Sequence, residues 1–251
     1  IRSDPATRLM PVVIISGLQG QQERVLGIEA GADDCLSKPV DRVELLARVR
    51  SLVRIKQHTD DLDSATSIVM TLASMIESRD GYGEGHCHRM ANYATGLGRA
   101  LWLDEADVRS LYRGAFLHDI GMLTVADSIL QKSGPLLPDE QERVRAHTVT
   151  GDRLCSNLRS LQAVRPIVRH HHEHLDGSGY PDGLQGSHVP LLAQIVGIVD
   201  TYEALTTERP YQQAVSSDTA FDTLRQHVQR GWRREDLVEH FASVIDHLHA
   251  T

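Results

Sequence analysis

Residues 171–181 read His-His-Glu-His-Leu-Asp-Gly-Ser-Gly-Tyr-Pro, and this segment constrains the fold more strongly than any other. Two adjacent imidazoles beside a carboxylate, followed by a glycine-rich loop, are hard to explain by packing or solvation, and they indicate a metal site. Neighbouring residues on a helix point about 100° apart, so His171 and His172 serve one ion only where a helix ends but readily serve two ions side by side. The segment therefore favours a dinuclear site, and the fold must bring further ligands to it from other elements.

Candidate ligands for such a site occur at five further positions. His118-Asp119 and Asp200 each follow an apolar helical run, His86 is expected to open a helix, and His147 is expected to lie in the middle of one. Neutral imidazoles combined with carboxylates are common ligands of divalent metals. The chain has 14 histidines but only 4% Phe, Tyr and Trp, and this skewed usage is consistent with metal binding.

From residue 80 onward, apolar residues recur at helical spacing and predict an all-helical domain. Asp104 and Ser217 are suitable N-caps, and loops rich in Gly and Pro are expected over 132–138 and 175–190. The expected helices are His86–Leu101, Glu105–His118, Pro138–Asn157, Ser160–His170, Pro190–Thr207, Ser217–Gln229 and Arg234–Leu248.

The N-terminal part has a different, β-α-β-α pattern. Residues 9–16 form a β-branched apolar run without polar alternation, which is typical of a buried parallel strand. A helix over 21–30 with an inward apolar face, a short strand over 35–37 and a helix from Asp41 follow. Two strands do not make a stable parallel sheet, so we expect the chain to be a fragment whose upstream part supplies the other strands.

Composition argues against several classes of function. The net charge of −8 disfavours binding of a nucleic-acid polymer, although bound metal cations would still attract a small anionic ligand. The sequence contains no apolar run of about 18 residues and no signal peptide, so we expect no membrane span. The cysteines Cys35, Cys87 and Cys155 have no paired spacing, which predicts a cytoplasmic protein with reduced thiols.

The N-terminal segment resembles the C-terminal half of a response-regulator receiver domain. The resemblance rests on Pro-Val-Val-Ile-Ile-Ser over 11–16, Gly-Ala-Asp-Asp over 31–34, and Lys38-Pro39. It implies a doubly wound α/β segment in which Lys38 contacts a phosphoryl group and Ser16 senses it, with the phospho-acceptor Asp upstream of this chain. An upstream histidine kinase is the implied partner. The alternative is some other doubly wound domain.

We expect the helix from Asp41 to continue past a polar stretch at 57–63 as a connector. Apolar residues between 68 and 76 recur at helical spacing, and this stripe either forms a homodimer or packs on its own domain. The predicted organisation is a partial receiver over 1–57, a helical connector over 58–80 and a helical domain over 81–251.

The complete ligand set resembles that of the HD-GYP family, metal-dependent phosphodiesterases of cyclic di-GMP. The family signature is His-Asp-x-Gly-Lys followed by His-His-Glu-x-x-Asp-Gly-x-Gly-Tyr-Pro, and residues 171–181 match its second part completely. The resemblance covers about residues 75–245. It implies a mainly α, HD-type phosphohydrolase domain that hydrolyses cyclic di-GMP to linear pGpG, to GMP or to both, with two divalent ions, iron or manganese. The metal ligands that it implies are His86, His118, Asp119, His147, His171, His172 and Asp200.

The resemblance also implies individual roles around the metals. Asp119 would bridge the two ions and would be catalytic together with His118. Glu173 and Asp176 are expected to orient the ligands from behind. The residues implied to contact substrate are Gly179 and Tyr180, at the rim of the pocket, and Arg209 and Tyr211.

Three positions depart from the family pattern. Met122 stands where the family has a lysine that contacts the scissile phosphate, and losing such a cation costs on the order of 3 kcal/mol, roughly a hundredfold in rate. Gln212 replaces a frequently basic residue, and Tyr82 replaces a Glu that holds a third ion in some members, which favours two ions.

These departures leave alternative functions open. One is an active cyclic di-GMP phosphodiesterase regulated by a receiver. Another is a catalytically weak or inactive domain that keeps its metals and signals by binding a ligand or a protein. A third is a phosphohydrolase acting on another nucleotide, although the intact Gly-Tyr-Pro loop argues against it.

Overall fold

The computed structural model describes residues 1–4, 7, 10–17, 21–77, 85–132, 134–208 and 213–249 of the 251-residue chain. The chain divides into two compact units, residues 1–67 and residues 68–251. No described helix is both long and apolar enough to cross a membrane. Two predicted substrate contacts, Arg209 and Tyr211, lie outside the described residues, as do Tyr82 and Gln212.

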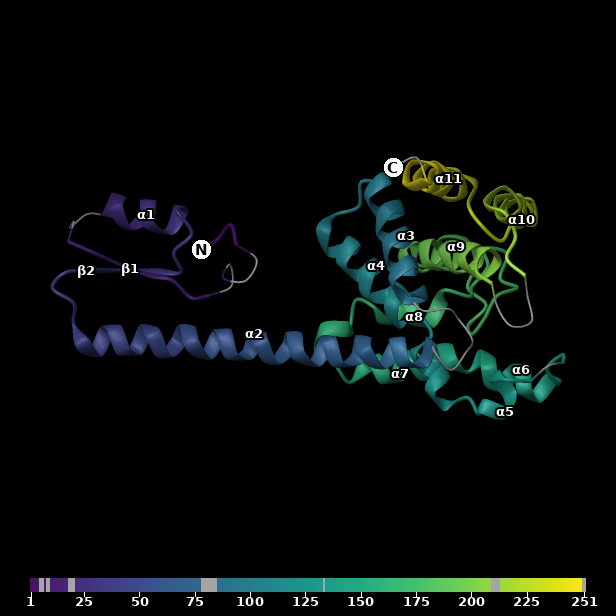
Figure 1. The fold of residues 1–251 in the computed structure, drawn as a ribbon, viewed down its shortest axis with the longest axis horizontal. Helices are drawn as coiled ribbons and strands as arrows, with labels where there is room; N and C mark the ends of the chain where they lie inside the picture. The colour runs from purple at the N-terminus through teal and green to yellow at the C-terminus, as the bar shows by residue number, and fades with distance from the viewer. Residues whose placement is uncertain are drawn as a thin grey trace. The chain divides into compact units, whose positions relative to one another are not determined.

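The first unit contains a two-stranded parallel sheet. Strand β1 (Val13–Ser16) pairs with β2 (Asp34–Ser37), and helix α1 (Gln21–Glu29) connects them (Figure 1). The register places Ser16 opposite Ser37 at the carboxyl ends of both strands. This is the β-α-β order that the sequence predicts, although residues 10–12 lie outside β1.

The predicted inward face of α1 is not buried in this unit, so this detail of the prediction is wrong. Val25, Leu26 and Ile28 are exposed, and so are Ile14 and Ile15 of β1. A two-stranded sheet offers too little apolar area to cover a helix face.

Helix α2 (Arg42–Glu77) runs without interruption through the polar stretch at 57–63, as the sequence predicts. The Asp41 carboxylate accepts the Glu44 N–H at 2.9 Å and caps the first turn. Near its other end, Ala73 and Ile76 are buried in the core of the second unit.

The second unit is helical, as predicted (Figure 1). Its helices are α3 (His86–Ala100), α4 (Glu105–Leu117), α5 (Asp127–Leu130), α6 (Pro138–Arg145), α7 (His147–Ser156), α8 (Arg165–His170), α9 (Leu191–Thr206), α10 (Ser217–Gln229) and α11 (Glu235–His249). Short 3₁₀ turns occur at η1 (Ile120–Thr124), η2 (Arg159–Leu161) and η3 (Gly186–His188).

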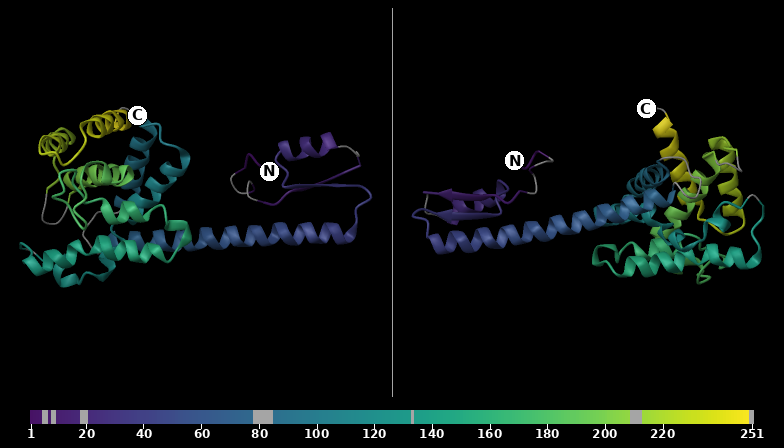
Figure 2. Two further views of the ribbon diagram at one scale, coloured as in Figure 1. Left: turned by 180° about the vertical axis from the view of Figure 1, so that it is seen from behind. Right: turned by 60° about the horizontal axis from the view of Figure 1, so that its bottom comes forward.

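Helix α9 is the central element of this unit. It packs against α3, α4, α8 and α10, and its Ile195, Val196, Ile198 and Val199 are fully buried. A helix that is apolar on several faces must be covered on all of them. Helices α10 and α11, yellow-green and yellow in Figure 2, pack together and extend this cover over α9 and α3. Asp200, on α9, is therefore held by a rigid scaffold.

One predicted helix is divided. The helix expected over 138–157 breaks at Ala146, so His147 opens α7 instead of lying in mid-helix. The reason is packing, because α6 buries no residue whereas α7 packs against η1 and α8.

Two other predicted helix starts also differ. The helix expected over 160–170 begins at Arg165, because Pro166 lacks an N–H and suits only the first turn. The N-cap of α10 is Ser216 rather than Ser217, and its hydroxyl accepts the Thr219 N–H at 3.3 Å. The N-cap predicted at Asp104 is confirmed.

Candidate metal centre

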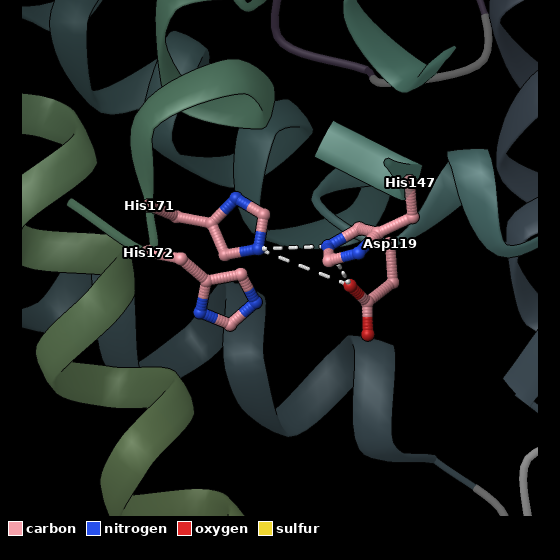
Figure 3. A group of neighbouring side chains, drawn as sticks. All are labelled: Asp119, His147, His171 and His172. Carbon is pink, nitrogen blue, oxygen red and sulfur yellow. Dashed lines mark hydrogen bonds and ion pairs between the residues drawn. The ribbon is translucent and has the colours of Figure 1, made fainter. Parts of the chain in front are cut away.

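Four side chains converge on one point of the second unit, as Figure 3 shows: Asp119, His147, His171 and His172. Each offers one ligand atom, and these atoms all lie within 4.8 Å of one another. His147 Nε2 is 3.1 Å from Asp119 Oδ1 and 3.5 Å from His171 Nε2. Two ligands that are each about 2.1 Å from one ion lie about 3–4 Å apart, so this donor set fits a metal.

A second group of side chains lies on the other side of Asp119. Asp119 Oδ2 is 3.4 Å from His118 Nε2, and Asp200 Oδ1 is 3.8 Å from the same nitrogen. The His86 ring centroid is 5.9 Å from that of His118. The structure thus brings all seven predicted metal ligands together, with the two oxygens of Asp119 facing different imidazoles.

Helix ends position the histidines of the cluster. His118 and His171 are the C-cap residues of α4 and α8, whereas His86 and His147 are the first residues of α3 and α7. A helix end leaves room for a side chain to leave the helical surface and also leaves backbone groups unpaired. Short helices that end at one place can therefore present several imidazoles to one point.

Three imidazoles are oriented by the same hydrogen bond. In His118, His147 and His171, Nδ1 donates to the backbone carbonyl three residues earlier, at 2.8, 2.6 and 2.9 Å. With the proton on Nδ1, each Nε2 carries a lone pair, which is the state a metal requires. His118 Nε2 is buried, makes no hydrogen bond within the described residues, and lies 3.4 Å from Asp119 Oδ2, so this nitrogen faces the cluster.

Glu203 orients the fourth of these imidazoles, and sequence reasoning missed it. This buried carboxylate places Oε2 2.6 Å from His86 Nδ1, and its Oε1 accepts a hydrogen bond from Arg89 Nε at 2.7 Å. Asp200 and Glu203 are one helical turn apart on α9 and share a face. That spacing was the available signal.

Burial and charge act in opposite directions on the pKa values of the cluster. Burial alone would lower the pKa of His118, but the Asp119 carboxylate beside it raises that pKa to about 10. Burial also opposes ionisation of Asp119, yet His118 holds the pKa of this carboxyl well below its usual range. Burial holds the pKa values of His171 and His172 well below the usual range. The cluster thus combines an ionised Asp119 and a protonated His118 with neutral His171 and His172.

The predicted role of Glu173 differs from what the structure shows. Its buried carboxylate accepts three backbone N–H groups, those of Asp182, Gly183 and Leu184, at 2.7, 3.1 and 3.0 Å. Its nearest imidazole contact is 3.8 Å from His170, which is not in the ligand set. Glu173 fixes the loop after the histidines, because backbone donors satisfy both of its oxygens.

Asp176 also stabilises this loop. Its Oδ1 accepts hydrogen bonds from the Ser178 N–H and hydroxyl at 2.9 and 2.7 Å. A Cβ on Gly179 would lie 2.3 Å from the His174 nitrogen, so only glycine lets the loop approach the histidine segment. The Tyr180 ring stacks on His172 with centroids 4.8 Å apart and planes 29° apart. Substrate contacts by Gly179 and Tyr180 stay predictions.

A buried guanidinium joins the histidine segment to α9. Arg233 donates to the carbonyl oxygens of Glu173 and Gly197 at 3.0 and 3.4 Å. Burial lowers its pKa to about 10, which still leaves it charged at neutral pH. Gly197 precedes Asp200 by about one helical turn, so Arg233 ties together two segments that carry predicted ligands. No local sequence signal marks this residue.

Turn η1, which follows Asp119, packs closely on α7. A Cβ on Gly121 would lie 1.9 Å from the His147 carbonyl oxygen, so only glycine permits this approach. Met122 is partly buried and packs against the hydrophobic core. The segment that follows Asp119 therefore brings no positive charge to the cluster.

Comparison with known proteins agrees with the helical fold. Residues 39–233 match the family model described as HD domain. Cyclic di-GMP phosphodiesterase response regulator RpfG of Xanthomonas campestris pv. campestris is 34% identical over 92% of this chain. The 3'3'-cGAMP-specific phosphodiesterase 3 of Vibrio cholerae is 33% identical over 74% of this chain. The chain spans 66% and 40% of the lengths of these two relatives.

A solved structure has a similar arrangement of helices. Bd1817, a HDG"Y"P protein from Bdellovibrio bacteriovorus, aligns with a TM-score of 0.57 over 74% of this chain and 64% of its own, at 17% identity. At that identity the likeness concerns the fold alone. Since the HD domain model matches more than half of the chain, this chain belongs to the HD domain family.

Proposed function

We propose that the chain is a phosphodiesterase that hydrolyses cyclic di-GMP with two divalent metal ions bound around Asp119. The arrangement of this carboxylate carries the proposal: Oδ1 lies 3.1 Å from His147 Nε2, and Oδ2 lies 3.4 Å from His118 Nε2. A carboxylate with an imidazole at each oxygen can bridge two ions. The names of the two similar phosphodiesterases support a cyclic dinucleotide as the substrate class.

In this proposal the two groups of side chains each hold one ion and share Asp119. Iron and manganese suit such a set of imidazoles and carboxylates. When bound, the ions would activate water for attack on phosphorus and neutralise the charge that develops on the phosphoryl oxygens. The residues that would hold one ion are Asp119, His147, His171 and His172, and those that would hold the other are His86, His118, Asp119 and Asp200.

The remaining residues of the site act through position. Hydrogen bonds that Nδ1 donates to backbone carbonyls hold the imidazoles with Nε2 facing the cluster. The loop that ends in Gly179 and Tyr180 forms the rim, with Arg209 and Tyr211 as further substrate contacts. Hydrolysis would release linear pGpG, GMP or both.

The test is turnover of cyclic di-GMP and, separately, of 3'3'-cGAMP by protein prepared without oxygen and loaded with iron or manganese. We expect hydrolysis by the wild type and none by Asp119→Asn. Asp139→Asn, an exposed carboxylate in α6, serves as the matched control and should match the wild type. Wild-type protein that binds no divalent metal would overturn the proposal.

A second function is favoured by Met122. Because this side chain packs against the core, η1 offers no cation to the scissile phosphate. The alternative is a domain that binds metals and nucleotide but signals with little or no catalysis. If the wild type binds cyclic di-GMP without hydrolysing it and Met122→Lys restores turnover, the alternative holds.

We also propose that residues 1–57 are part of a receiver domain, that 58–80 form a connector, and that a histidine kinase regulates the output. Support comes from the parallel β1–β2 pair, in which the Lys38 N–H donates to the Ser16 carbonyl at 2.7 Å beside the strand ends. The exposed Leu72 and Met75 of α2 support a homodimer through the connector. Leu72→Glu should then lower the mass measured by light scattering from dimer to monomer.

A further inference from the structure

Arg145 is a cation of the second unit that has no role in the proposed metal centre. It is the last residue of α6, is exposed, and forms no ion pair with any described carboxylate. By contrast, Arg165 and Arg169 are both held by Asp152. An arginine of this kind is free to bind an external anion.

The contacts of Arg145 connect it to the metal cluster through one aromatic ring. Its guanidinium carbon lies 5.1 Å from the centroid of the Tyr180 ring, which is cation–π distance. The same ring stacks on His172, with centroids 4.8 Å apart. The guanidinium is thus placed at the rim of the cluster.

The backbone at Arg145 is also fixed relative to the cluster. The carbonyl of the preceding residue, Val144, accepts the His147 Nδ1–H at 2.6 Å, and the Arg145 carbonyl accepts the Thr148 hydroxyl at 3.0 Å. The end of α6 is therefore bound to the start of α7 through the carbonyls of Val144 and Arg145. A fixed backbone reduces the conformational freedom that this part of the chain loses when a ligand binds.

Arg145 favours an anion at this rim, whereas the carboxylates of the cluster disfavour one. At the hydroxyl of Tyr180, the carboxylates of Asp119 and Asp200 raise the pKa, after the larger effect of burial, and Arg145 lowers it. All three charges therefore act on the Tyr180 hydroxyl. Met122 supplies no charge from η1, so Arg145 is a cation at the rim that can meet a phosphate. A guanidinium presents parallel N–H donors that match two phosphate oxygens.

We propose that Arg145 is a substrate-binding residue whose guanidinium, resting on Tyr180, binds a phosphate of the cyclic dinucleotide. This inference rests on the proposed function, because it presumes that a cyclic dinucleotide occupies the site. It adds a contact from α6 to those predicted from the loop and from 209–211. Because the contact exists before and during reaction, it contributes to binding rather than to the chemical step.

The experiment compares Arg145→Met with Arg143→Met, a matched change at another exposed arginine of α6. Binding of fluorescently labelled cyclic di-GMP and steady-state hydrolysis are measured on the metal-loaded chain. We expect Arg145→Met to weaken binding and raise KM about tenfold to a hundredfold, with kcat within about threefold of the wild type. Arg145→Lys should fall between the two, because it keeps the charge but loses the fork.

The outcomes distinguish a failure of the proposed role of Arg145 from a failure of the proposed function. If the wild type binds or hydrolyses cyclic di-GMP and the Arg145→Met and Arg143→Met variants behave alike, the role of Arg145 is refuted while the function stands. A fall in kcat at unchanged KM and affinity refutes it as well. If the wild type neither binds nor hydrolyses the nucleotide, the function itself fails and the inference fails with it. Melting temperatures within about 2 °C of the wild type exclude misfolding at this exposed position.

Discussion

Gly121→Ala tests whether the contact between η1 and α7 sets the geometry of the metal centre. The added Cβ would lie 1.9 Å from the His147 carbonyl oxygen and 2.8 Å from the Gly151 nitrogen. Ordinary contact at a Cβ begins at 3.4 Å, so the first of these distances is about 1.5 Å too short. Both neighbours are backbone atoms, so no side-chain rotation can relieve the overlap.

The overlap has a cost in stability and a larger one in metal binding. Overpacking of this kind destabilises a domain by about 3 kcal/mol, which lowers the melting temperature by about 6–12 °C for a chain of this size. Relief of the overlap also moves His147, whose Nε2 lies 3.1 Å from Asp119 Oδ1. Metal–ligand distances tolerate shifts of only about 0.2 Å, so a displacement of about 1 Å removes His147 from the site.

The assay is metal content per chain by mass spectrometry, together with thermal unfolding. We expect Gly121→Ala to lose at least one of two bound ions. Gly134→Ala is the matched control, because a Cβ there meets no atom within 4 Å. Wild-type metal content and an unchanged melting temperature in Gly121→Ala would refute the reasoning, since η1 and α7 would then tolerate separation without disturbing the ligands.

Three further outcomes are expected. Glu203→Gln weakens the charged hydrogen bond to His86 and should lower metal affinity about tenfold to a hundredfold, measured by chelator competition. The control is Glu208→Gln, at an exposed position. Equal metal affinities of the two variants would contradict this expectation. Addition of metal at about 100 times its Kd should stabilise the wild type by about 2.7 kcal/mol but not Asp119→Asn, and equal shifts in melting temperature would count against the site. Burial raises the pKa of Cys155 to about 11, so at pH 8 only about one thiol in a thousand is ionised. Alkylation of Cys155, followed by mass spectrometry, should be slow at pH 8 and accelerate as the pH rises toward 11; rapid labelling of the folded chain at pH 8 would contradict its burial.

The sequence by itself determined the class of the fold and the set of residues that meet in the proposed metal centre. Helices follow from apolar spacing within one segment, and caps such as Asp104 follow from local hydrogen bonding. Candidate ligands could be named because His171-His172 and His118-Asp119 are pairs of chemically specific side chains with few other uses. These signals are local, so no knowledge of packing was needed to read them.

Tertiary structure decided how these residues are held. Glu203 orients His86 across 117 residues of sequence, and Arg233 reaches the Glu173 carbonyl across 60. The break at Ala146 and the backbone role of Glu173 also depend on which surfaces pack together. A side chain's hydrogen-bond partner is set by the position of distant backbone, and a single sequence records neither the distance nor the direction. The sequence thus named the residues of the proposed metal centre, and the packing of α9 against α3, α4 and α8 decided their orientation.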